Sequence, residues 1–253
     1  MLILLPPSET KRAGGAGVPL RPGALALPQL DAQRARVVDA LVELSADPDR
    51  AARVLSLSAK QRGEIAVNAG LRDAPTLPAV DRYTGVLFDA LDAGGLDTRS
   101  RRWLGEHVLV HSAPFGPVGA LDPIPAYRLG AAASVPGLPP LRRLWREAIT
   151  AALGERAPAF VLDLRSEAYV ALGPVPDAVP SVFVRIVSEG PGGAVRALNH
   201  FNKHAKGALV RELALARPRV RSLSGLLAWL RAAGHRVVES EGEWLLFEAP
   251  RGS

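Results

Sequence analysis

The chain has 253 residues, of which 48% are hydrophobic and 22% charged, with no cysteine and a formal net charge of +6. This length and charge content are typical of a globular protein and exclude wholesale disorder. The absence of cysteine excludes disulfides, cysteine-ligated zinc, thiolate-held iron–sulfur clusters and thiol peroxidase chemistry. Apolar runs fall far short of the ~20 residues that a membrane helix needs. The run at 1–5 is too short for a signal peptide, so we expect a cytoplasmic protein with no membrane partner.

The first half of the chain is predicted to hold one short strand followed by helices. Residues 2–5 form an apolar run that ends at Pro6, which predicts a buried strand. Dense glycine and proline from residue 11 to residue 28 predict a long loop. Apolar residues at helical spacing predict helices at 30–44 and, after Pro78, at 79–91. Between them, Ser58 and Gln61 have the spacing of a capping box that opens another helix.

The second half contains the other predicted strands. Apolar runs predict strands at 108–110, 160–164 and 182–187, and a proline-rich loop follows the first of these. Helical spacing predicts helices at 139–153, 199–216 and 224–233, and residues 235–247 predict a hairpin that turns at Glu241 and Gly242. The tally predicts an α/β (mixed α+β) fold, with a modest mixed sheet surrounded by helices. We expect a single domain over residues 1–253.

Polar loops follow three of the predicted strands. They hold residues 8–11, residues 122–128, and the pair Arg165 and Ser166. Ligand sites of open α/β sheets collect at the carboxyl ends of strands, so these loops are candidates for one shared site.

Positive charge is concentrated between residues 196 and 236. This segment has nine basic residues and one acid, Glu212, and therefore carries +8 while the remainder of the chain nets −2. A localised basic surface is typical of a protein that binds a polyanion, and a solvated arginine-rich helix face explains the same pattern. The basic residues are Arg196, Lys203, Lys206, Arg211, Arg217, Arg219, Arg221, Arg231 and Arg236.

Lysine is rare in this chain. Arginine supplies 27 of the 31 basic residues, and the lysines are Lys11, Lys60, Lys203 and Lys206. A compact ammonium can do work that a guanidinium cannot, which makes each lysine a better functional candidate. Gly207, beside Lys206, is predicted to permit close approach of the backbone.

Metal ligation is not indicated. His200 and His204 have the spacing of a metal pair on a helix, but Lys203 and Lys206 lie beside them and oppose a divalent cation. Phosphate would suit this cluster better than zinc or iron. We expect neither a metal site nor a cofactor.

Five motifs, in order along the chain, resemble those of the YaaA family of peroxide-stress proteins. They are Leu4–Lys11, Arg82–Phe88, Leu121–Leu129, Asp163–Tyr169 and Phe201–Gly207. The resemblance implies one mixed α/β body with a basic cleft, DNA binding, and protection against peroxide by limiting free intracellular iron. It also implies a helix-hairpin-helix-like element, for which the matching stretch is 54–71. The first motif differs from the family's Ser-Pro-Ala-Lys form at Glu9 and Thr10, whereas Lys11 matches.

The sequence supports two hypotheses about function. The first, which we favour because the resemblance and the basic segment agree, is DNA binding in the peroxide stress response. Contact with the phosphate backbone would be largely independent of sequence. The residues predicted to bind nucleic acid or another anion are Lys203, Lys206, Arg211, Arg217, Arg219, Lys60, Arg62 and Arg165.

The second hypothesis is an enzyme that acts on a small anionic or nucleotide-like substrate. Its pocket would be lined by Lys11, Arg128, Asp163, Lys203 and Lys206, with catalytic candidates Lys11, Asp163, Arg128, Tyr127 and Thr84. A buried ion pair between Asp163 and Arg128 would explain those two residues equally well. Tyr83 and Tyr169 are predicted to be core aromatics with satisfied hydroxyls. Convergence of the pocket residues would favour the enzyme, and an open basic strip would favour DNA binding.

Overall fold

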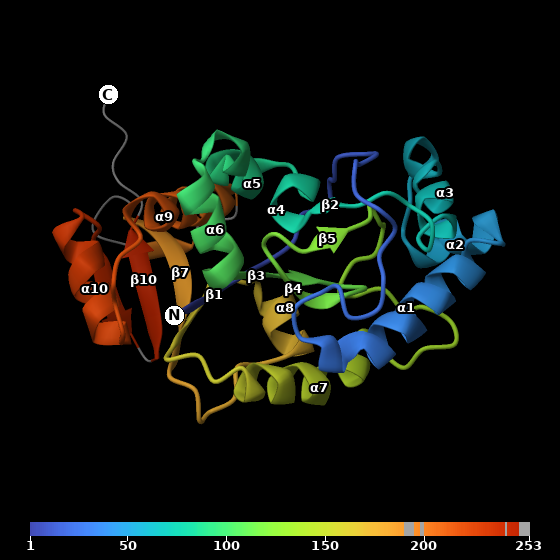
Figure 1. The fold of residues 1–253 in the computed structure, drawn as a ribbon. Coiled ribbons are helices and arrows are strands. Elements are labelled where there is room, and N and C mark those ends of the chain that lie inside the picture. Colours follow the sequence, from blue (N-terminus) through green and yellow to red (C-terminus); the bar gives the residue numbers. More distant parts are fainter. Residues whose placement is uncertain (190–194, 198–199, 241, 248–253) are drawn as a thin grey trace.

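A mixed sheet runs through the centre of the protein (Figure 1). The computed structural model describes residues 1–189, 195–197, 200–240 and 242–247. The strands lie in the order β4-β3-β1-β6-β7-β10-β9, and β8 pairs with β7. Their bounds are β1 Leu2–Leu5, β3 Val108–Ser112, β4 Gly116–Gly119, β6 Val161–Asp163, β7 Ser181–Glu189, β8 Val195–Ala197, β9 Val237–Ser240 and β10 Glu243–Phe247.

The central strands β3, β1, β6, β7 and β10 are parallel to one another. All residues of β1, β3 and β6 are buried, as expected of parallel strands with helices on both faces. The antiparallel strands β4 and β9 form the two ends of this strand order. The predicted strands and the C-terminal hairpin are confirmed. Glu241 in the predicted turn, and Asn199 at the start of a predicted helix, lie outside the described residues.

Helices cover both faces of the sheet (Figure 1). The helix α7 lies along one face with α8, whereas α5, α6 and α9 lie over the other. The helices are α1 Asp31–Leu44, α2 Pro48–Val54, α3 Glu64–Ala69, α4 Ala79–Arg82, α5 Val86–Leu91, α6 Thr98–His107, α7 Leu141–Glu155, α8 Glu167–Leu172, α9 His200–Ala216 and α10 Leu223–Ala232. Short 3₁₀ turns are η1 Pro28–Leu30, η2 Ala59–Gln61 and η3 Ala93–Gly95, and a two-stranded ribbon joins β2 Leu77–Pro78 to β5 Pro123–Ile124. Within the described ranges, no helix combines the length and apolarity needed to cross a bilayer.

The predicted helix at 79–91 is wrong in one respect, because it is broken between α4 and α5. Tyr83 pairs with Lys11 in a β-bridge, and the Thr84 N–H donates to the carbonyl of Thr10 at 3.2 Å. Gly85 has a φ of 92°, a conformation that favours glycine. The chain therefore leaves the helical path to pair with the loop that follows β1.

The segment 54–71 contains the end of α2, the turn η2 and the short helix α3. The capping box is confirmed, since the Ser58 N–H donates to Gln61 Oε1 at 3.1 Å. It opens the 3₁₀ turn η2, however, and α3 begins only at Glu64. This segment delivers Glu64 and Asn68 to the site described next.

Close backbone approach at Gly207 is confirmed. The helix α9 packs on α5, and a Cβ atom on Gly207 would lie 2.0 Å from the carbonyl oxygen of Leu87. Real Cβ atoms do not come that close to a backbone oxygen, so only glycine fits without a shift of one helix.

Candidate functional site

Lys11 lies at the centre of a cluster formed by loops that are distant in the sequence. Its Nζ donates to the carbonyl oxygens of Ser8, at 3.0 Å, and Glu9, at 3.2 Å. The same nitrogen lies 4.0 Å from the centre of the Tyr127 ring and 5.6 Å from that of Tyr83. Burial is the main cause that lowers the pKa of Lys11 to about 7, and the nearby charge of Arg128 adds to it. Near neutral pH, both the charged and the neutral amine are therefore populated.

The two tyrosines beneath Lys11 form a buried pair. Their hydroxyl oxygens are 2.8 Å apart, and the ring of Tyr83 stacks on Phe88 with 5.0 Å between centroids. Burial raises the pKa of both phenols, so they stay protonated at physiological pH. Tyr83 is a buried aromatic with a satisfied hydroxyl, as predicted.

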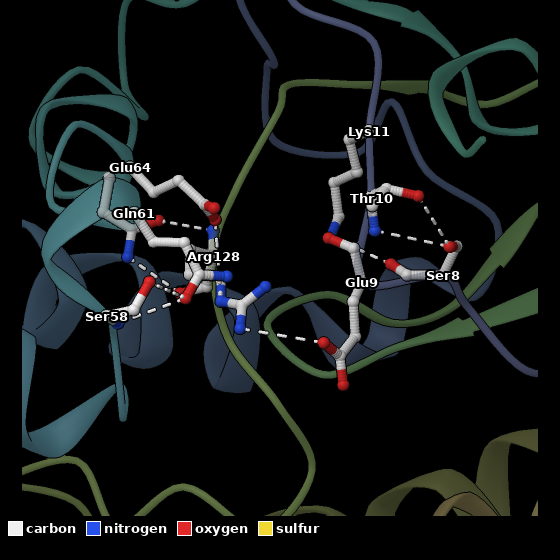
Figure 2. Close-up of polar contacts among 9 residues, drawn as sticks. Ser8, Glu9, Thr10, Lys11, Ser58, Gln61, Glu64 and Arg128 are labelled. Atoms are coloured by element: carbon white, nitrogen blue, oxygen red, sulfur yellow. Dashed lines mark hydrogen bonds and ion pairs between the residues drawn. The ribbon is translucent and has the colours of Figure 1, made fainter. Parts of the chain in front are cut away.

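Arg128 is fixed through its backbone but loosely held through its side chain. The Asn68 side chain on α3 accepts from the Arg128 N–H and donates to its carbonyl, both at 2.8 Å. The guanidinium lies between two carboxylates, 3.5 Å from Glu64 and 3.8 Å from Glu9 (Figure 2). Neither contact is a hydrogen bond, although the side chain is only 16% exposed.

Arg82 is a buried arginine of the same fold whose guanidinium has hydrogen-bond acceptors on all sides. It donates to the carbonyl oxygens of Ile124 at 3.1 Å and Pro75 at 3.0 Å, and also to that of Arg12. The Arg128 guanidinium differs, because its side chain keeps 16% of its surface exposed and makes ion pairs but no side-chain hydrogen bond within the part of the chain that the structure describes.

Three hydroxyl groups lie beside Lys11 where the β1 loop meets the Thr84 segment. Thr10 Oγ1 is 3.2 Å from Ser8 Oγ (Figure 2). It also lies 3.0 Å from Thr84 Oγ1, from which it accepts, and it donates to the Thr84 carbonyl. Gly85 keeps this corner open, because a Cβ atom there would lie 3.2 Å from Thr10 Oγ1. The cluster of Ser8, Thr10, Lys11, Thr84, Tyr127 and Arg128 is called the strand-end site below.

Asp163 belongs to a second, buried network. Its carboxylate accepts from Arg165 Nη2 at 2.6 Å and Nε at 2.9 Å, and the Arg165 Nη1 donates to His111 Nδ1 at 2.9 Å. The ion pair weighed between Asp163 and Arg128 is therefore wrong. Asp163 forms its ion pair with Arg165, only two residues away in the sequence. Asn68 holds the Arg128 backbone in a position from which the Arg128 side chain faces Glu64 and Glu9.

His111 is neutral in this network. Arginine can only donate, so His111 Nδ1 accepts and the hydrogen of the neutral ring resides on Nε2. Burial and the charge of Arg165 lower the pKa of His111 well below its usual range.

Two residues predicted to contact phosphate are buried. Arg165 has no exposed surface, and Lys206 is 4% exposed with its Nζ donating to the Arg165 carbonyl at 3.4 Å. Burial lowers the pKa of Lys206 to about 8. Both side chains support the turn after β6, which leaves little surface for a duplex to contact.

The other predicted phosphate contacts divide into paired and exposed residues. Arg211 pairs with Asp92 at 3.0 Å, Arg217 donates to Ser100 at 2.9 Å, and Arg62 pairs with Asp49. Exposed side chains are those of Lys60, Lys203 and Arg219. Among the pocket residues, Lys11, Arg128, Tyr127 and Thr84 come together, whereas Lys203 is exposed on α9 and Asp163 belongs to the buried network.

Glu64 and Asn68 are residues that sequence reasoning missed. They lie about sixty positions from Arg128 along the chain and carry no local signal of that contact. The break in the helix at Thr84 and Gly85 did have a signal in the sequence, because glycine within a helical pattern often marks a break. Within the described residues, no group of three or more acidic, histidine or cysteine side chains is placed to hold a metal ion.

Comparison with known proteins assigns the chain to a family. A family model described as peroxide stress protein YaaA matches residues 1–241. A UPF0246 protein of Corynebacterium efficiens is 44% identical over 247 residues, which cover 96% of each chain. A UPF0246 protein of Streptomyces coelicolor is 42% identical over 243 residues, which cover 94% of this chain and 92% of the relative. The resemblance found in the five motifs is thereby confirmed, and the chain belongs to the peroxide stress protein YaaA family, UPF0246.

Proposed function

We propose that the strand-end site binds a small anionic substrate and that Lys11 transfers a proton to or from it. The observation that carries the proposal is the guanidinium of Arg128, which is largely buried and has two long ion pairs but no hydrogen bond within the described residues. A carboxylate or phosphate oxygen pair matches the guanidinium fork and would supply the missing hydrogen bonds.

Lys11 supports a reaction as well as binding. General acid–base groups work best when their pKa lies near the operating pH, and that of Lys11 is lowered to about 7. The hydroxyls of Thr10 and Thr84 use their hydrogens within the cluster and keep oxygen lone pairs that can accept from a donor group of a substrate. Strongly shifted lysines of this kind collect at functional sites, because burial and neighbouring charge are what tune them.

The binding step is tested with Arg128→Lys, which keeps the charge and removes the fork. Inorganic phosphate and acetate are the probes, and the readout is their stabilisation of the protein against thermal unfolding. We expect at least about tenfold weaker apparent affinity in the variant, corresponding to ~1.4 kcal/mol. Arg72→Lys is the matched control, since Arg72 is an exposed arginine paired with Asp39. Equal stabilisation of wild type and Arg128→Lys would contradict the proposal.

We also propose DNA binding as a second function, carried by the exposed cations Lys203 and Arg219 on and after α9. The family's description as a peroxide stress protein is consistent with a protective role at DNA. The contacts would be made to phosphates and would be independent of base sequence.

The double variant Lys203→Ala/Arg219→Ala tests this second function. We expect it to bind a random-sequence duplex much more weakly than wild type at low salt. Arg142→Ala/Arg143→Ala is the matched control, because it removes the same charge from exposed positions on α7, on the opposite face of the sheet (Figure 1). Equal losses in the two double variants would indicate a general charge effect and contradict a defined DNA-binding face.

Protection against peroxide would then combine shielding of DNA with limitation of free intracellular iron. Cells that lack the protein should show more chelatable iron and more DNA strand breaks after peroxide. Complementation with Lys11→Ala tests the strand-end site, and complementation with Lys203→Ala/Arg219→Ala tests the DNA face. Full rescue of both readouts by both variants would contradict the two assignments.

A further inference from the structure

We propose that Lys11 is a covalent nucleophile and that the substrate of the strand-end site is a short oxo acid. Its carboxylate would bind Arg128, and its carbonyl carbon would bond to Lys11 Nζ. This inference rests on the proposed anion-binding function and deepens it by naming the substrate class.

The hydrogen bonds of Lys11 suit a neutral nucleophilic amine. A neutral primary amine has two N–H donors and one lone pair, and the carbonyl oxygens of Ser8 and Glu9 accept both donors. The lone pair is then left for attack on a carbon. Burial removes water from the nitrogen and reduces the advantage of the charged form, and this effect outweighs the attraction of the Tyr127 ring, 4.0 Å away, for an ammonium.

Glu9 connects Lys11 to Arg128 and carries the two groups that the substrate would present to them. Its backbone carbonyl accepts from Lys11 Nζ, while its carboxylate lies 3.8 Å from the guanidinium of Arg128 (Figure 2). One glutamate residue therefore spans the two groups. A short oxo acid carries the same two groups, a carbonyl and a carboxylate, on one chain, and in a 4-oxo acid their carbons lie three bonds apart where those of Glu9 lie four bonds apart. Its carboxylate would take the place of the Glu9 carboxylate, which is 85% exposed and free to move aside.

The covalent step balances without an added oxidant or reductant. Nζ adds to the carbonyl carbon and forms the C–N bond. The C–O bond then breaks, and the oxygen leaves as water with both hydrogens of the amine. The product is an imine between Lys11 and the oxo acid. Water reverses the step, so the adduct is seen only when it is trapped.

Trapping with borohydride and peptide mapping test the proposal. Hydride adds to the imine carbon and a proton from water to the nitrogen, which leaves a stable secondary amine. Levulinate, a 4-oxo acid, is the probe, and 2-pentanone is the same ketone without the carboxylate. We expect Lys11 to be modified by levulinate at least tenfold more than by 2-pentanone, and more than the exposed Lys203 on the same molecule. Lys11→Arg should abolish this modification.

The experiment separates this inference from the proposed function. Stabilisation by levulinate that Arg128→Lys weakens, with no adduct at Lys11, would overturn the covalent role and leave the anion site standing. Neither stabilisation nor adduct would contradict both. Modification of Lys203 equal to that of Lys11 would also overturn the covalent role, because it would show only the general reactivity of lysine.

Discussion

At the scale of single residues, Lys11 makes the stability of the protein depend on pH. Its pKa is lowered from 10.5 to about 7 in the folded chain, so between these values the unfolded chain binds a proton that the folded chain does not. Stability therefore rises as pH increases through this window. Below about pH 7 the folded protein holds a charged amine in surroundings that disfavour it.

The prediction is a pH-dependent difference between wild type and Lys11→Met. From pH 6 to pH 9, wild type should gain about 1–2 kcal/mol of unfolding free energy relative to the variant, allowing for the partial exposure of Lys11. Denaturant unfolding at the two pH values measures it. Lys60→Met, at an exposed lysine, should show no such trend. A constant difference between wild type and Lys11→Met would show that the Lys11 amine is not destabilised by burial.

At the scale of elements, the packing of α9 on α5 depends on a missing side chain. The Cβ of an alanine at position 207 would lie 2.0 Å from the Leu87 carbonyl oxygen and 3.0 Å from Ala90 Cβ. The same contact holds α9, with Lys203 and Lys206, against the helix that begins after Thr84 and Gly85. A shift of α9 would therefore displace Lys203 and Lys206 and also the Thr84 segment of the strand-end site.

Gly207→Ala should destabilise the protein by about 1–3 kcal/mol, as overpacking does, despite the better helix propensity of alanine. Urea unfolding gives the value. The control is Gly94→Ala, because an added Cβ at this residue of η3 meets nothing within 4 Å. That change should stay within about 0.5 kcal/mol. A neutral Gly207→Ala would mean that the two helices can separate at little cost.

At the scale of the whole molecule, the basic segment is partly neutralised by other parts of the chain. Asp92 and Asp97 pair with Arg211 and Arg217, and Glu239 lies 3.8 Å from Arg231. The charge of +8 along the sequence is therefore not the charge that a ligand meets. Within the described residues, the exposed basic residues of the segment are Lys203, Arg219, Arg221, Arg231 and Arg236, of which Arg231 faces Glu239 and Arg236 lies over the ring of Phe247.

The salt dependence of the proposed DNA binding should reflect Lys203, Arg219 and Arg221, the exposed cations outside the contacts just named. With about three phosphates neutralised, log Kd should rise with log salt concentration at a slope of about 3, and Lys203→Ala should reduce that slope by about 1. Titrations at several salt concentrations measure it. A slope near 8 would mean that the paired and buried cations also contact DNA, which the geometry argues against.

The sequence by itself determined the strands, several helices and the family. Those elements can be predicted from local sequence, because continuous apolar runs, helical periodicity and capping residues act over a few positions. The YaaA motifs are likewise short local patterns, and they identified Lys11, Thr84, Tyr127 and Arg128 as candidates before their proximity was known. The break at Tyr83–Gly85 was missed because the pairing of this segment with Lys11 is a long-range contact.

Only the tertiary structure decided which charges are paired. Asp163 with Arg165, and Arg128 with Glu64 and Glu9, are choices among many partners that sequence spacing leaves equal. Burial of Lys206 and Arg165 follows from how α9 and the loop after β6 pack, and no local pattern records it. The lowered pKa of Lys11 has the same origin, since desolvation and neighbouring charge exist only once distant loops come together.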